Sequence, residues 1–120
     1  MKRRIIALPH FDRRLKRLVK KFRSLSAELS AFEKALEDNP RQGKDLGSGL
    51  YKIRLASKSK GTGKSGGFRV VTYYVEQVGD EENVYLVTIY DKSEEASIAK
   101  TDLLMIVQEA LEEESDEADD

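Results

Sequence analysis

The sequence predicts an α+β domain in which helices pack on an antiparallel sheet. Three patterns predict it: helical periodicity over residues 12–36, a change to period two at Leu50, and two later segments rich in β-branched and aromatic residues. A further helical pattern follows Asp91. The expected order is an N-terminal strand and helical hairpin, then a three-stranded antiparallel meander and a C-terminal helix. We expect the helices mainly on one side of the sheet, which leaves the other face for function.

The N-terminal third predicts a short strand and two helices. Residues 5–8 are apolar and end at Pro9, which cannot donate a hydrogen bond to a neighbouring strand. Apolar side chains recur at helical spacing from Phe11 to Phe22, which predicts an amphipathic helix over residues 12–23 with a Lys- and Arg-rich outer face. Ser26 can cap a second helix that stops near Pro40, so the two helices form an antiparallel hairpin.

The middle of the chain predicts the sheet. Glycines at positions 43, 47 and 49 indicate a loop, after which Tyr51, Ile53 and Leu55 alternate with their neighbours. A polar loop over residues 57–67 contains four glycines and three lysines. The segments 68–75 and 83–90 alternate little, as expected for central strands covered on both faces, and residues 79–82 suit a hairpin turn.

Charge is unevenly distributed along the chain. Residues 1–74 contain 19 Lys or Arg and 6 Asp or Glu (net +13), whereas residues 75–120 contain 2 and 16 (net -14). This asymmetry predicts a basic face for a polyanion, most simply RNA. Seven of the last nine residues are acidic, so we expect one domain over residues 1–111 and a disordered tail over 112–120. The tail either maintains solubility, which we favour, or lies over the basic face as a weak electrostatic lid.

Composition excludes several classes of protein. The chain has no cysteine, which excludes disulfides and thiolate metal sites. Its one histidine, His10, is expected to have a capping or surface role, and no His, Asp or Glu set has metal-ligand spacing, so we expect no metal and no cofactor. The apolar run at residues 5–8 is too short for a signal peptide or a membrane span. We therefore expect a soluble cytoplasmic protein without a membrane partner.

The loop over residues 57–67 includes Gly-Thr-Gly-Lys-Ser at 61–65, which invites a nucleotide-binding interpretation. A P-loop would need a glycine where this chain has Lys58 and a helix after the motif, whereas a strand is predicted there. We therefore reject ATP or GTP binding. The loop suits backbone contacts to phosphates, and equally a flexible solvated hairpin loop.

Strand alternation predicts a cluster of cations. If the apolar residues of segment 50–55 face the helices, Lys52 and Arg54 point to the open face. Pairing of the three strands can then form one concave patch from Lys52, Arg54, Arg69, Tyr90 and Lys92. Mutual repulsion would lower the pKa of lysines in such a cluster, although Asp91 or Glu94 can neutralise part of it.

Three segments resemble the RelE superfamily of bacterial toxins. They are residues 50–55 (Leu-Tyr-Lys-Ile-Arg-Leu), 64–71 (Lys-Ser-Gly-Gly-Phe-Arg-Val-Val) and 84–92 (Val-Tyr-Leu-Val-Thr-Ile-Tyr-Asp-Lys). The resemblance covers about residues 5–111, and the loop over 57–67 is most similar to the HigB-like branch. It implies a RelE-like fold and the toxin half of a toxin–antitoxin system. Such a toxin is a metal-independent mRNA endoribonuclease that acts on the translating ribosome and binds a cognate antitoxin.

The resemblance also implies roles for residues. A guanidinium offers a rigid fork of donors, so Arg54 and Arg69 suit the phosphate, while Lys52 or Lys92 can serve as base or acid. Well-known members have a tyrosine at a position that lies near Ile98 here, so Tyr90 is the expected substitute. The set expected to be catalytic is Arg54, Arg69, Tyr90 and Lys92. The set expected to bind RNA is Lys52, Lys58, Lys60, Lys64 and Tyr73.

Two alternatives to the endoribonuclease hypothesis stay open. The chain can be a toxin that inhibits its target by binding alone, as the related ParE branch does with DNA gyrase. It can also be a non-catalytic basic module that binds RNA or the ribosome. Arg69 together with Tyr90 and Lys92 on adjoining strands favours catalysis, whereas the missing tyrosine at position 98 favours the alternatives.

Overall fold

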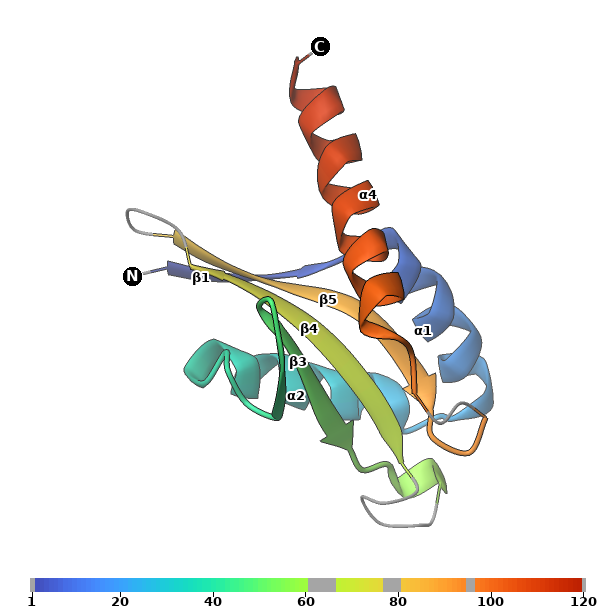
Figure 1. The fold of residues 1–120 in the computed structure, drawn as a ribbon. Coiled ribbons are helices and arrows are strands. Elements are labelled where there is room, and N and C mark those ends of the chain that lie inside the picture. The colour runs from blue at the N-terminus through green and yellow to red at the C-terminus, as the bar shows by residue number, and fades with distance from the viewer. Residues whose placement is uncertain (1, 61–66, 77–80, 95–96, 120) are drawn as a thin grey trace.

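The computed structural model describes residues 2–60, 67–76, 81–94 and 97–119, and its elements follow the predicted order with one added strand (Figure 1). The strands are β1 (Lys2–Ala7), β2 (Lys44–Gly47), β3 (Leu50–Leu55), β4 (Phe68–Glu76) and β5 (Glu81–Asp91). The helices are α1 (Pro9–Lys21), α2 (Leu25–Asp38) and α4 (Lys100–Asp119), with a short 3-10 helix, η1 (Lys58–Lys60). The predicted α+β fold is confirmed.

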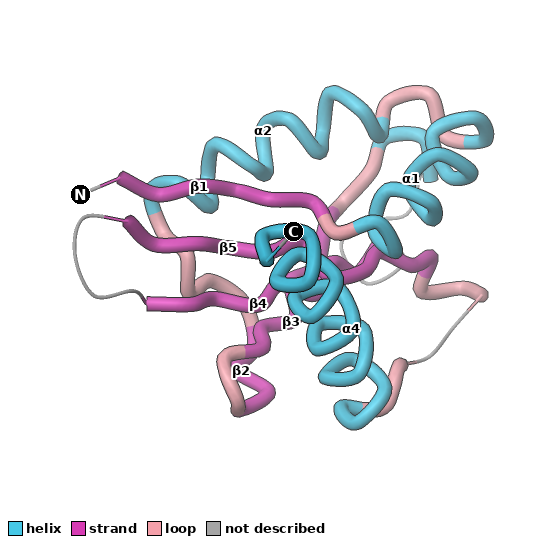
Figure 2. The backbone as a smooth tube through the Cα atoms, turned by 90° about the horizontal axis from the view of Figure 1, so that it is seen from above, coloured by secondary structure: helices cyan, strands magenta, loops and turns pink. Residues whose placement is uncertain are grey.

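The five strands form one sheet in the order β1-β5-β4-β3-β2 (Figure 2). The predicted antiparallel meander is present as β3, β4 and β5, and β1 adds to it in parallel beside β5. The sequence did not predict β2, which lies where we expected a loop. Positive φ angles at Ser48 (57°) and Gly49 (84°) give the two-residue turn that joins β2 to β3. This hairpin brings Lys44 opposite Lys52.

The first two helices differ slightly from their predicted bounds. α1 begins at Pro9 instead of residue 12, because a proline at the first helical position needs no hydrogen-bond partner for its nitrogen. α2 begins at Leu25, so the predicted cap Ser26 lies inside its first turn. Ser24 occupies the capping position without a capping hydrogen bond, and its hydroxyl instead contacts η1.

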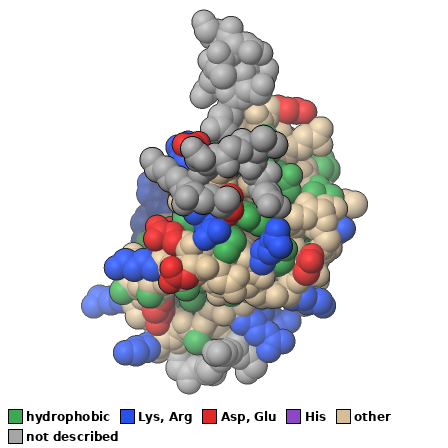
Figure 3. Space-filling view, turned by 90° about the vertical axis from the view of Figure 1, so that its left-hand side faces the viewer, with side chains coloured by type: hydrophobic (Ala, Val, Ile, Leu, Met, Phe, Trp, Pro, Cys, Tyr) green, Lys and Arg blue, Asp and Glu red, His purple; other side chains and the backbone are tan. Residues whose placement is uncertain are grey.

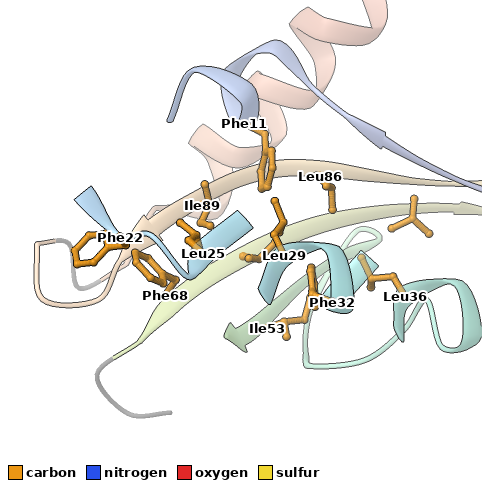
Figure 4. Close-up of a cluster of buried hydrophobic side chains, with 12 residues drawn as sticks. Phe11, Phe22, Leu25, Leu29, Phe32, Leu36, Ile53, Phe68, Leu86 and Ile89 are labelled. Carbon is orange, nitrogen blue, oxygen red and sulfur yellow. The ribbon is translucent and has the colours of Figure 1, made fainter. Parts of the chain in front are cut away.

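One face of the sheet is covered by α1 and α2. Their buried side chains form a core with apolar residues of β3, β4 and β5, and Figure 4 shows this cluster between the helices and the sheet. Phe22 and Phe68 meet edge to face with ring centroids 5.1 Å apart. Burial of aromatic and aliphatic side chains of this size supplies most of the stabilising free energy of a domain this small.

The opposite face is partly covered by α4, which corrects the expectation that the helices lie mainly on one side. Leu103 and Val107 of α4 are buried against Tyr85, Val87 and Tyr90 in a second core. Figure 1 shows α4 crossing above the sheet and projecting away from it at its C-terminal end. The face expected to be open for function is therefore divided into an α4-covered part and a remaining part.

The acidic segment continues α4. Its backbone is helical as far as Asp119, whereas its composition predicts a disordered tail over 112–120. The domain boundary after residue 111 stays a prediction. The predicted turn at residues 79–82 and the motif at 61–65 lie wholly or partly outside the described residues.

Candidate functional site

The part of the sheet that α4 leaves open carries a pocket of about 200 Å³, which we call the cationic pocket. All the described residues that line it are cationic: Lys44, Lys52, Arg54, Arg69 and Lys92. They come from β2, β3, β4 and the residue after β5. On the side of the molecule seen in Figure 3, by contrast, charges of both signs are interspersed.

The strand register places like charges directly opposite each other. Lys44 pairs with Lys52 across β2 and β3, and Arg54 pairs with Arg69 across β3 and β4. Tyr90 of β5 lies opposite Arg69 on its other side. Like charges at directly opposed positions destabilise a sheet. The pocket therefore costs folding stability, a cost that a bound anion would offset.

The alternation predicted for β3 is confirmed. Ile53 is buried in the core beneath α1 and α2, with Tyr51 and Leu55 packed against that core. Successive side chains of a strand point to opposite faces, so Lys52 and Arg54 project on the other side.

A β-bulge in β5 directs Tyr90 to the same face. Val71 pairs with Thr88 and Thr72 pairs with Leu86, which leaves Val87 unpaired. Before the bulge Leu86 faces α1 and α2. After the bulge Tyr90, four positions further along the chain, faces α4. In a regular strand these two side chains would share a face. The extra residue therefore re-aims the end of β5, as bulges near functional sites commonly do.

Burial and neighbouring cations lower the pKa of Lys52. Partial burial is the largest cause, followed by repulsion from Lys44, Lys92, Arg69 and Arg54. The predicted lowering of a lysine pKa by this cluster is thus confirmed at Lys52. A lysine with a lowered pKa loses its proton more readily, so Lys52 is suited to proton transfer.

Arg69 is 6% exposed and lies at the centre of the three paired strands. Its Nη1 donates to the carbonyl oxygen of Phe68 at 3.3 Å. Two residues earlier, a Cβ on Gly67 would lie 2.4 Å from the carbonyl oxygen of Leu55, so only glycine fits where the chain enters β4. The Gly67 carbonyl also accepts a hydrogen bond from the backbone nitrogen of Lys92 at 3.2 Å. This contact ties the backbone of Lys92 to the start of β4.

Tyr90 is only 2% exposed and packs in the core beneath α4. It lines a cavity of about 230 Å³ together with Lys52, Ile98 and Lys100, among others. Lys52 lines both this cavity and the cationic pocket, so the two are adjacent. A ring that is buried in this way is not available to stack on a base of the RNA.

Lys60 lies outside the cationic pocket. Its Nζ donates to both carboxylate oxygens of Asp91 at 2.7 Å, and it lies 5.2 Å from the ring centroid of Phe22. Asp91 is 2% exposed. Burial raises the pKa of Asp91, but hydrogen bonds from Lys60 and Ser93 outweigh this effect and lower it overall. The ammonium group that we assigned to RNA is therefore engaged in an ion pair of the fold.

A set of serines holds the neighbouring residues of η1. The Ser24 Oγ lies 2.7 Å from the Ser59 Oγ and 3.2 Å from the Ser57 Oγ, and it donates to Glu28 at 3.1 Å. The backbone nitrogen of Lys58 donates to the other carboxylate oxygen of Glu28 at 2.8 Å. We call these contacts, together with the Lys60–Asp91 pair, the loop anchor. The described start of the loop is thus fixed, where the sequence suggested a flexible segment.

The remaining predicted RNA-binding residues lie elsewhere. Tyr73 lines a separate apolar cavity beside Leu104, Val107 and Leu111 of α4. The side chain of Lys58 is exposed at η1, and Lys64 lies outside the described residues. The sequence missed Lys44, because its position in a strand depends on the unpredicted β2. The turn residues Gly47 to Gly49 were the signal that could have revealed this hairpin.

Comparison with known protein families identifies the fold. Residues 4–117 match the family model of the RelE toxin of RelE/RelB toxin–antitoxin systems. The chain belongs to the RelE toxin family. It is therefore a toxin of a toxin–antitoxin system, with a cognate antitoxin as its partner. The resemblance to the RelE superfamily that the strand motifs indicated is confirmed.

The RelE toxin presents neither a metal site nor a membrane span among its described residues. No three His, Cys, Asp or Glu side chains in that part of the chain gather as metal ligands would. No described helix is both long and apolar enough to cross a membrane. The donor set of the toxin's cationic pocket consists of ammonium and guanidinium groups, which suit an anion such as a phosphate.

Proposed function

We propose that this toxin is a metal-independent endoribonuclease that cleaves mRNA, acting in the cytoplasm on the translating ribosome. The observation that carries the proposal is the cationic pocket, in which like charges oppose each other across the strands. A backbone phosphate placed there would neutralise this repulsion. The loop between β3 and β4, rich in glycine and lysine, favours the HigB-like branch of the family.

The proposed reaction uses the RNA's own 2′-hydroxyl as nucleophile. The 2′-oxygen loses its proton to a base and forms a bond to the adjacent phosphorus, while the bond from phosphorus to the 5′-oxygen breaks and that oxygen gains a proton from an acid. The products are a 2′,3′-cyclic phosphate and a free 5′-hydroxyl. The enzyme must supply the base, the acid and positive charge for the developing negative charge on the phosphate.

The geometry suggests a role for each group. Arg54 and Arg69, adjacent across β3 and β4, would hold the phosphate oxygens, since a guanidinium offers a rigid fork of donors. Lys52, whose pKa is lowered, would act as the base. Lys92, or the hydroxyl of Tyr90, would act as the acid. Ile98 lines the same cavity as Tyr90, which supports Tyr90 as the substitute for the tyrosine that other family members have at that position.

Primer extension on cellular mRNA after induced expression tests the proposal. We expect new 5′ ends in transcripts with wild-type toxin and a loss of cleavage of about 100-fold or more with Arg69→Ala, the size expected when a group that stabilises transition-state charge is removed. Because Arg69 is buried, its variant must be shown to fold by circular dichroism. Arg54→Gln, at an exposed position, provides an independent second variant.

Lys34→Gln is the matched control, because Lys34 is an exposed cation of α2 outside the pocket. We expect it to retain cleavage. A folded Arg69→Ala toxin with full cleavage would remove Arg69 from the site. Growth arrest with intact transcripts would contradict the nuclease proposal and leave gyrase inhibition or simple binding.

A further inference from the structure

A second basic surface lies on α1. Six of its thirteen residues are Lys or Arg, and one, Asp12, is acidic. Residues three or four positions apart lie on the same face of a helix, so the six cations fall into two groups on different faces. Arg14, Arg17 and Lys21 line a groove beside the sheet, whereas Arg13, Lys16 and Lys20 do not line it.

The groove has a volume of about 240 Å³ and runs between α1 and the end of β5. Tyr90 and Asp91 contribute to its opposite wall. Tyr90 also lines the neighbouring cavity that contains Lys52, and Lys52 in turn lines the cationic pocket. Neighbouring cavities therefore share first Tyr90 and then Lys52 in their walls, from α1 to the cationic pocket.

The acidic side chains of the groove do not prevent an anion from binding. The carboxylate of Asp91 is already engaged by Lys60 at 2.7 Å. Glu94 lies 3.7 Å from Lys21, but the side chains are 60% and 66% exposed. Exposed pairs of this kind contribute little and are readily exchanged. A phosphate that approaches Lys21 and Arg17 can therefore take the place of Glu94.

We propose that the groove between α1 and β5 is a second phosphate-binding subsite for RNA, which holds backbone phosphates beside the one in the cationic pocket. This inference rests on the proposed RNA-directed function. It adds a second contact area, in which Arg17 and Lys21 bind phosphates beyond the reacting one. Removal of cations that line the groove should then weaken RNA binding more than removal of the same number of α1 cations outside it.

The test compares two double variants of the whole toxin. Arg17→Gln/Lys21→Gln removes two groove cations, and Lys16→Gln/Lys20→Gln removes two exposed cations of the same helix outside the groove. Both are made in the Arg54→Gln background, so that the RNA is not consumed. Fluorescence anisotropy of a labelled single-stranded oligoribonucleotide is measured at several salt concentrations.

Each phosphate contact to a single strand contributes about 0.7 to the slope of log affinity against log salt. We expect the groove variant to lower this slope by about 1.4, corresponding to two lost contacts, and the control variant to lower it by less than half as much. Equal losses in the two variants would overturn the proposal, because they would show delocalised attraction only. An unchanged slope in the groove variant would overturn it as well.

Sedimentation with ribosomes distinguishes the source of the phosphates. If the groove variant binds the oligonucleotide more weakly than the control variant does, the groove holds the substrate strand. If it binds only ribosomes more weakly, the groove holds ribosomal RNA. A deficit confined to antitoxin binding would overturn the proposal. If the parent protein binds no RNA in either assay, the proposed function fails too. If transcripts are cleaved but the two double variants bind alike, this inference alone fails.

Discussion

Lys60 and Lys52 belong to the same basic stretch and are both partly buried, but their surroundings are opposite. Lys60 lies on the α1 and α2 side of the sheet, where both carboxylate oxygens of Asp91 accept its hydrogen bonds. Lys52 lies on the other side, where Lys44, Lys92, Arg69 and Arg54 repel it. The first lysine therefore stabilises the fold, whereas the second lowers its stability. This difference separates a cation that is paired within the fold from the cations that we propose to bind RNA.

The largest expected effect is on the structural side. We expect Lys60→Met to lower the free energy of unfolding by about 3 kcal/mol, because it leaves the buried carboxylate of Asp91 without its ion-pair partner. Urea-induced unfolding measures this change. Lys58→Met, at an exposed position two residues earlier, is the control and should change stability by less than about 0.5 kcal/mol.

The double variant Lys60→Met/Asp91→Asn sharpens the comparison. It removes the uncompensated charge and should recover at least half of the lost stability. If Lys60→Met is as stable as Lys58→Met, the ion pair contributes nothing and Lys60 is available to a ligand.

A smaller loss is expected at the serine part of the loop anchor. Ser24→Ala removes the hydroxyl that contacts Ser57, Ser59 and Glu28. We expect a loss of about 1 kcal/mol, the usual size for a partly exposed hydrogen-bond network. Ser26→Ala, in the exposed first turn of α2, is the matched control. Equal stability of the two variants would show that the Ser24 hydroxyl does not contribute to holding η1.

Lys52→Met should change the stability of the protein in the opposite direction. Removal of a cation that faces four others should raise the free energy of unfolding by about 0.5 kcal/mol, within the range for opposed like charges, while RNA affinity falls. Urea unfolding and oligonucleotide anisotropy measure the two effects. A variant that loses stability and affinity together would indicate that Lys52 supports the fold.

The smallest effect is a dependence on pH. In the folded protein the pKa of Lys52 lies below its ordinary value of 10.5. As the pH rises, the folded protein therefore loses this proton before the unfolded chain does. Stability then rises with pH, because the unfolded state binds more protons. The destabilising contribution of Lys52 is therefore complete at neutral pH and fades as pH rises toward 10.5. The advantage of Lys52→Met over the wild type should be smaller at pH 10.5 than at pH 7; an equal advantage would contradict a lowered pKa.

Much of the fold could be predicted from local patterns. The meander followed from period two at Leu50 and from the β-rich segments, and the alternation of Lys52 with Ile53 assigned their faces correctly. The strand β2 was missed because its four residues, Lys44–Gly47, carry no alternating apolar pattern. The position of α4 was missed because periodicity identifies a helix but not the face of the sheet that it covers.

The site could be predicted only in part. Arg54 and Arg69 meet as expected, but Lys60 does not join them, since its partner Asp91 is 31 residues away in the sequence. A run of basic residues does not show which of its members has a carboxylate beside it in the folded chain. Lys44 was missed together with β2, and Tyr90 reaches the correct face only through the bulge at Val87.

That bulge makes the pairing of β5 as important as its composition. Many apolar residues at position 87 would leave the pairing of the strand unchanged. A deletion of one residue there would remove the bulge and still leave Tyr90 beneath α4, because Tyr90 would then lie three positions after Leu86, and side chains three positions apart on a regular strand point to opposite faces. A strand of the present length that paired without the bulge would instead turn Tyr90 toward α1 and α2, and Asp91 toward the cationic pocket, where its carboxylate would reduce the positive charge. A change of pairing alone, without any change to Arg54, Arg69 or Lys92, would thus exchange the two faces of this strand.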